Sequence, residues 1–229
     1  MKRNATRIMK QCMSLLTIGV LSFSLSGVAA AKLPPAKTAA DSGPTDRDNS
    51  AKQLAFHDAM HKLWEDHVMW TRLFLVSAAA NLPDKGATTE RLLQNQVDIG
   101  NAIKPYYGDA AGEKLTALLK THIVTAAELV AALQANDTAK VQDASKRWTA
   151  NADEIAAFLS GANPKNWPPA AMKQMMHEHL TLTTVEVQSH LKRDWAADIA
   201  AYDKIQNQIL TMADGLSDGI INQFPDQFK

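Results

Sequence analysis

Three histidines occupy core positions of three separate helical patterns. His67 lies in the run 56–77, whose apolar residues recur at alternating spacings of four and three, and His122 and His179 lie in similar runs. This spacing is typical of a helix face packed against other helices. Neutral imidazoles that meet inside a bundle are good ligands for zinc, copper or iron. The sequence therefore predicts a divalent-metal or small-ligand site on these three side chains.

Two carboxylates could support such a site. Asp203 and Glu154 each lie beside a core position of their own helical pattern, where they could act as a fourth ligand or orient a ligating histidine. The chain has neither the Glu-x-x-His pairs of di-iron bundles nor a His-Glu-x-x-His motif. The alternative is that the histidines form a purely structural polar layer, hydrogen-bonded within the core.

A second group could line a ligand pocket between helices. Its members are Trp70, Arg72, Trp148 and Asn151. The default role of the tryptophans is core packing. We expect Arg72 to form an ion pair with Asp98 or Glu154, and an anion site is the alternative.

His57 and His61 are four residues apart, so they share one face of a helix. Such a pair can chelate a metal ion on a helix surface. The pair lies near the start of the first helical pattern, and we expect an ordinary solvated pair there instead.

Helical periodicity runs through the rest of the chain, without a convincing alternating strand. It predicts an all-α, antiparallel up-down bundle of about six helices with a long C-terminal helix. The helices are expected at about 50–81, 88–104, 109–134, 138–161, 168–181 and 184–224. Thr183 and Glu186 form a capping-box pattern that predicts the last helix start. The range 184–224 is expected to be one helix, and a bend near Asp194 is the alternative.

The N-terminus has the pattern of a secretory signal peptide. Four basic residues are followed by an apolar run at 13–28 and by three alanines, which predicts residues 1–31 as the signal, with cleavage near Ala31. Residues 32–50 are polar and contain three prolines, and we expect a disordered linker. We then expect a bundle domain at 51–224, exported to the periplasm or secreted, with no transmembrane segment after processing. An uncleaved N-terminal anchor is the alternative.

Cleavage would leave 20 basic against 24 acidic residues and would remove Cys12, the one cysteine. A mildly acidic chain argues against nucleic acid as a partner. Without cysteine, disulfides and thiolate metal sites are excluded. The sequence also has no Gly-rich phosphate loop and no G-x-S-x-G motif. We expect a protein that binds a small ligand or a protein partner rather than an enzyme, with a metal-dependent oxidase or hydrolase as a third interpretation.

Several blocks carry a resemblance to a known family. They are Leu-Trp-Glu-Asp-His-Val-Met-Trp-Thr-Arg at 63–72, the stretch 91–107, Lys-Arg-Trp at 146–148 with Asn-Ala-Asp-Glu-Ile at 151–155, and 194–204 ending in Tyr-Asp-Lys. Over nearly all of 54–224 the chain resembles small, exported, helical bacterial proteins without an established function. The resemblance implies a helical fold and no mechanism.

Some of these relatives are labelled glycosyltransferases or amino-acid kinases. Both activities normally require α/β nucleotide-binding folds, which this sequence does not predict. Relatives often have histidines after the Tyr-Asp-Lys block, where this chain has Gln206 and Gln208. That difference weakens a metal site that would use the last helix.

Overall fold

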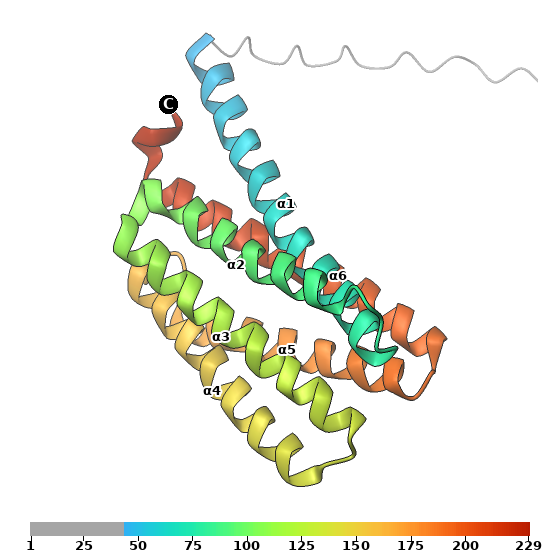
Figure 1. Cartoon of the computed structure of the whole chain (residues 1–229). Helices are drawn as coiled ribbons and strands as arrows, with labels where there is room; N and C mark the ends of the chain where they lie inside the picture. The colour runs from blue at the N-terminus through green and yellow to red at the C-terminus, as the bar shows by residue number, and fades with distance from the viewer. Residues whose placement is uncertain (1–43) are drawn as a thin grey trace, which may run out of the picture. The chain divides into compact units, whose positions relative to one another are not determined.

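Six helices form an all-α bundle, which confirms the predicted fold class (Figure 1). The structure is a computed structural model that describes residues 44–229, so the predicted signal peptide and residues 32–43 of the predicted linker lie outside the described residues. The elements are α1 (Pro44–Ala79), α2 (Lys85–Tyr107), α3 (Asp109–Gln134), α4 (Thr138–Ala162), α5 (Pro169–Leu191), α6 (Trp195–Gln223) and the short 3₁₀ helix η1 (Pro225–Phe228).

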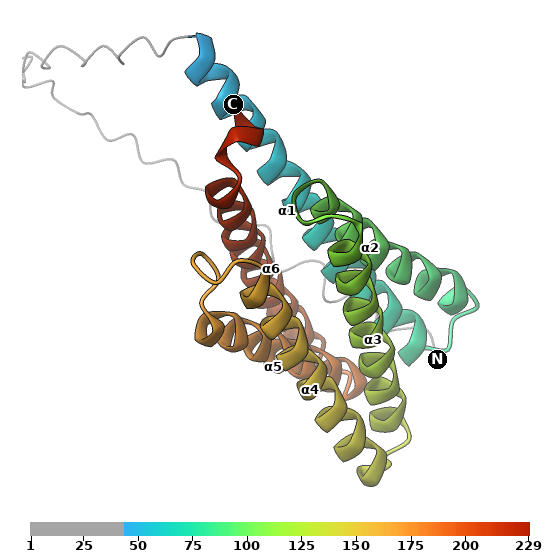
Figure 2. The same ribbon diagram turned by 90° about the vertical axis from the view of Figure 1, so that its left-hand side faces the viewer.

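The helices alternate in direction and pack as a closed ring. Each helix packs against its neighbours in the chain, and α6 returns to pack against α1 (Figures 1 and 2). The odd-numbered helices α1, α3 and α5 also contact one another. Side chains on their inner faces can therefore meet inside the ring, and this arrangement positions the buried histidines.

The core is apolar and closely packed along the inside of the ring. Ile99, Ile155 and Ile209 are almost completely buried. Burying an aliphatic side chain of this size stabilises a fold by about 1.5–3 kcal/mol. At Gly100, α2 and α3 approach so closely that an added Cβ would collide with the Thr116 hydroxyl and lie 2.6 Å from the Gly112 carbonyl oxygen.

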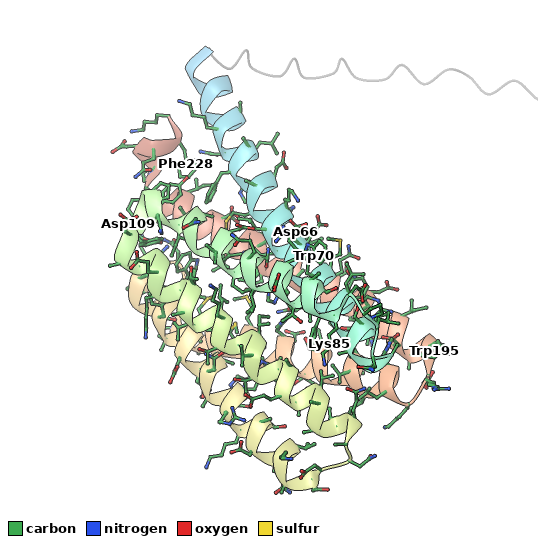
Figure 3. The ribbon with its side chains drawn as sticks, viewed as in Figure 1. Asp66, Trp70, Lys85, Asp109, Trp195 and Phe228 are labelled. Carbon is green, nitrogen blue, oxygen red and sulfur yellow. The ribbon has the colours of Figure 1, made fainter. Side chains whose placement is uncertain are left out.

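The bundle is longer at both ends than the predicted range 51–224. α1 begins at Pro44, inside the predicted linker. Proline is well tolerated in the first turn of a helix, and no further proline follows before the apolar seam. At the other end, η1 carries Phe228 (Figure 3). The Phe228 ring packs against Phe56 and Tyr106, with ring centroids 5.2 and 5.6 Å away.

The expectation of one helix over 184–224 is wrong, because the chain breaks between α5 and α6. Arg193 has a φ of 61°, and the Asp194 side chain accepts a hydrogen bond from the Ala197 N–H at 3.2 Å. Asp194 is thus the cap of α6. Thr183 and Glu186, predicted as a helix start, lie inside α5 instead.

Among residues 44–229, α3 alone is long and apolar enough to cross a membrane by length and composition. Half of its apolar window is buried within the bundle. The core helix of a bundle passes the same test, so this property alone does not place α3 in a membrane.

Candidate functional site

Three helices bring the three core histidines to one interior region. His67 of α1, His122 of α3 and His179 of α5 are all buried. The ring centroids of His67 and His179 are 5.9 Å apart, and those of His122 and His179 are 6.4 Å apart. All three line a cavity of about 30 Å³. His179 is the central member of the group, with a histidine on each side.

His122 has a hydrogen-bond partner for each ring nitrogen. Its Nδ1 lies 2.9 Å from the Asn151 side-chain oxygen, and its Nε2 accepts from the Trp148 indole N–H at 3.1 Å. The Asn151 amide nitrogen donates to the Leu118 carbonyl. Nδ1 must therefore carry the proton, and no lone pair is left for a metal. Trp148 and Asn151, predicted to line a ligand pocket, hold His122 in place.

The other two histidines have unused nitrogens. His179 Nδ1 lies 3.1 Å from the Gln208 side-chain oxygen, and the Gln208 amide donates to the Met175 carbonyl. His179 Nδ1 is thus the donor, and its Nε2 carries the lone pair. His67 Nδ1 is buried and makes no well-formed hydrogen bond, and the same is true of the indole N–H of Trp64, which lines the same cavity. The side chains of Gln96 and Asn95 lie near the His67 ring and partly offset the effect of burial on its pKa.

Burial keeps the three imidazoles neutral. Loss of hydration lowers the pKa of His67 and of His122 to about 3, and the neighbouring histidines add to the effect. Burial also lowers the pKa of His179. A positive charge in a closed apolar region is unfavourable, so the proton is lost.

The predicted supporting carboxylates do not reach this cavity. Asp203 and Glu154 have exposed side chains, and neither lines the cavity. The lining contains no Asp or Glu at all.

A second histidine group lies on the surface where α1 and α6 meet. His61 Nε2 is 2.6 Å from Asp214 Oδ1, and His57 is 3.7 Å from Asp214 and 3.2 Å from Asp218. Within the described range 44–229, the only group of three possible ligand atoms lying within 4.8 Å of one another is that of His57, His61 and Asp214. The predicted solvated pair thus has two carboxylates facing it.

The sequence contained a signal for this group. Asp214 and Asp218 are four residues apart on α6, as His57 and His61 are on α1. The two pairs face each other only because the ring closes and places the last helix beside the first.

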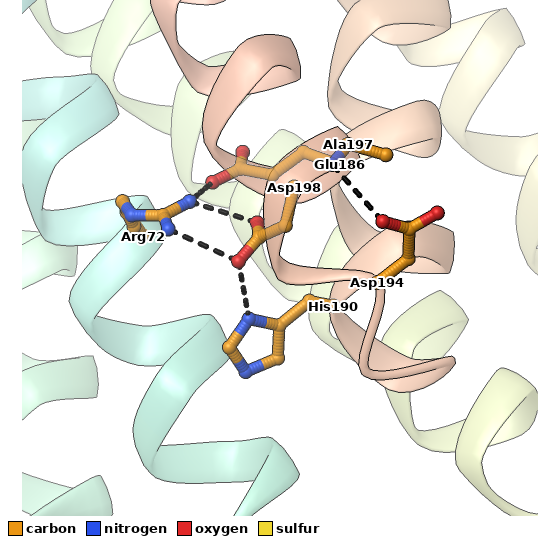
Figure 4. Close-up of polar contacts among 6 residues, drawn as sticks. All are labelled: Arg72, Glu186, His190, Asp194, Ala197 and Asp198. Carbon is orange, nitrogen blue, oxygen red and sulfur yellow. Dashed lines mark hydrogen bonds and ion pairs between the residues drawn. The ribbon is translucent and has the colours of Figure 1, made fainter. Parts of the chain in front are cut away.

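The ion pair predicted for Arg72 is present, but the predicted partners, Asp98 and Glu154, are wrong (Figure 4). Its guanidinium donates to Glu186 at 2.5 Å and to both oxygens of Asp198 at 2.9 and 3.1 Å. His190 Nδ1 lies 3.0 Å from the Asp198 carboxylate.

Both carboxylates of this network are almost fully buried, at 3% side-chain exposure. Burial raises the pKa of Glu186, although Arg72 opposes the shift. Burial alone would also raise the pKa of Asp198, but hydrogen bonds from Arg72 and His190 hold it below its usual value. The network ties α1 to α5 and α6 across the break.

Trp70, also predicted to line a ligand pocket, is half-buried on α1 (Figure 3). The Arg91 guanidinium lies 5.3 Å from the centre of its ring. An open cleft of about 690 Å³ lies at the α5–α6 break, lined by His190 and Trp195. Neither Trp70 nor Arg72 lines it.

Comparison of the chain with protein-family models, with curated proteins and with solved structures finds no match. Function is therefore argued from the two histidine groups.

Proposed function

We propose that this chain is an exported helical-bundle protein that binds a divalent transition-metal ion through His57, His61 and Asp214, with Asp218 as a fourth donor. One ligand atom each of His57, His61 and Asp214 lies within 4.8 Å of the other two, and this observation supports the proposal.

The donor set suits a divalent ion. Imidazole nitrogens bind zinc, copper, nickel and iron, and carboxylates add oxygen ligands. The negative charges of Asp214 and Asp218 offset the two positive charges of the ion. Their side chains are more than half exposed, at 53% and 66%, so an ion can enter from solvent.

A metal ion would replace the hydrogen bond between His61 and Asp214. Zinc lies about 2.0–2.2 Å from nitrogen and oxygen ligands, so the two atoms, 2.6 Å apart, must separate slightly. The exposed Asp214 side chain has room to rotate. Because imidazole must be deprotonated to coordinate, binding weakens on acidification.

The alternative is a structural or interaction protein in which all histidines only pack. The complete hydrogen bonding of His122 supports that role for the buried layer. This alternative does not account for the two histidines and two aspartates that face each other on the surface.

Isothermal titration of the purified protein with Zn(II) tests the proposal. We expect about one equivalent to bind, and at least tenfold weaker binding in His61→Ala and in Asp214→Asn. His177→Ala is the matched control, because His177 also pairs with an aspartate, Asp153 at 2.7 Å, but without a second histidine. No uptake, or equal uptake by all variants, would overturn the proposal.

A further inference from the structure

The buried cavity has a second kind of metal donor beside its imidazoles. Met60, Met176 and Met212 line it together with His67 and His179. Each methionine is at most 5% exposed. Thioether sulfur is a soft donor that selects Cu(I) among biological metals.

Two residues that line this cavity have a buried polar atom without a hydrogen bond. His67 Nδ1 has no partner, and His179 Nε2 is the nitrogen not bonded to Gln208. The Trp64 indole N–H is also unpartnered, and its ring lies edge-on to His67 with centroids 5.7 Å apart. Buried polar atoms are rarely left without a partner, so an occupant of the cavity is expected.

Charge decides which occupant fits. A divalent ion would bring two positive charges into a lining without any carboxylate, and burying an uncompensated charge is very costly. A monovalent ion carries half that charge and, unlike a proton on one imidazole, it would bond to several imidazole and thioether donors at once. A volume of about 30 Å³ excludes an organic ligand and leaves room for one ion or one to two waters.

We propose that this cavity is a second metal site, which takes one soft monovalent ion, copper(I), held by His67, His179 and one or more of the three methionines. The site is separate from the surface site and does not depend on it. His122 keeps its structural hydrogen bonds and takes no part in coordination.

Silver(I) is a suitable probe, because it shares the charge and softness of copper(I) and needs no reductant. We would titrate it, in chloride-free buffer, into a His57→Ala/His61→Ala double variant that lacks the surface site. The intrinsic fluorescence reports binding, because Trp64 lines the cavity. We expect one equivalent to bind, with quenching of the fluorescence, and copper(I) to displace the silver under anaerobic conditions.

Methionine variants then locate the ion. Met176→Leu and Met212→Leu keep the apolar volume, so the fold should survive, which thermal unfolding would verify. The double substitution Met176→Leu/Met212→Leu should weaken silver binding at least tenfold. Met172→Leu is the matched control, because Met172 is also buried but does not line the cavity.

Two results would overturn the proposal. One is the absence of silver uptake, which would leave water as the occupant. The other is equal uptake by the Met176→Leu/Met212→Leu variant and the Met172→Leu control. Neither result bears on the surface site, whose zinc titration is measured on the protein with His57 and His61 intact.

Discussion

The three buried histidines differ in what their nitrogens do, although all three are neutral. His122 uses both nitrogens within the core, His179 leaves one lone pair, and His67 has an unpartnered Nδ1. The residue type alone does not distinguish them. Their neighbours assign a structural role to His122 and leave the other two available to a ligand.

Neutral buried imidazoles make folding stability depend on pH. An unfolded histidine binds a proton near pH 6.5, whereas folded His67 and His122 do so only near pH 3. The unfolded chain therefore binds more protons between these values, and stability falls as pH falls. Each histidine should contribute up to about 1.4 kcal/mol per pH unit.

Urea unfolding at pH 7, 6, 5 and 4 would measure this slope. His122→Gln removes one titrating group, so its slope should be shallower by about 1.4 kcal/mol per pH unit in the lower part of the range. Identical slopes in the two proteins would contradict the prediction.

The sequence predicted where His67, His122 and His179 lie, but not what they contact. Their spacing within apolar seams was enough to place them in the core. Arg72 illustrates the limit, because the predicted ion pair exists but its partners are Glu186 and Asp198. Partner choice depends on which helices are neighbours, and periodicity within one helix carries no such information.

At the scale of the element, most helices were predictable and the α5–α6 break was not. The break contains neither glycine nor proline, and Arg193 adopts a left-handed conformation that is uncommon for its residue type. The Thr183 and Glu186 pattern matched a helix start. Glu186 serves a tertiary ion pair instead, and Thr183 donates to the His179 carbonyl one turn back.

Loss of the Asp194 cap should cost measurable stability. Asp194→Ala removes the side-chain oxygen that accepts from the Ala197 N–H, and such losses typically cost about 1 kcal/mol. Asp203→Ala, an exposed position on the same helix, should change stability by less than about 0.5 kcal/mol. Urea unfolding compares the two, and equal losses would argue against the cap.

The close approach of α2 and α3 should tolerate no side chain at Gly100. In Gly100→Ala the new methyl group would press on the Thr116 hydroxyl and the Gly112 carbonyl, so the helices must separate. Overpacking of this kind typically costs about 1–3 kcal/mol.

Gly86→Ala is the control, because it also adds a methyl group to α2 but meets nothing within 4 Å. Alanine is the better helix former, so this variant should be neutral or more stable. Thermal unfolding of both variants checks the contrast, and a stable Gly100→Ala would show that the two helices can separate freely.

At the scale of the molecule, closure of the ring creates both candidate sites. The contact of α6 with α1 aligns the surface histidines with Asp214 and Asp218, and the meeting of the odd-numbered helices encloses the cavity. The two sites differ in charge: the surface site carries two carboxylates and the cavity none. Neither site follows from the pattern of a single helix, since each is formed by helices far apart in the chain.

Because the surface site joins the first helix to the last, a bound ion should stabilise the whole bundle. An ion that binds only the folded protein adds about 2.7 kcal/mol when its free concentration is 100 times the dissociation constant. Zinc should therefore raise the thermal midpoint, EDTA should reverse the rise, and Asp214→Asn should abolish it. His177→Ala should keep the full response, because its Asp153 pair joins α5 to α4 and has no second histidine. If the thermal midpoint of the unsubstituted protein is the same with and without zinc, the prediction is wrong, and the contact between α1 and α6 forms without a metal.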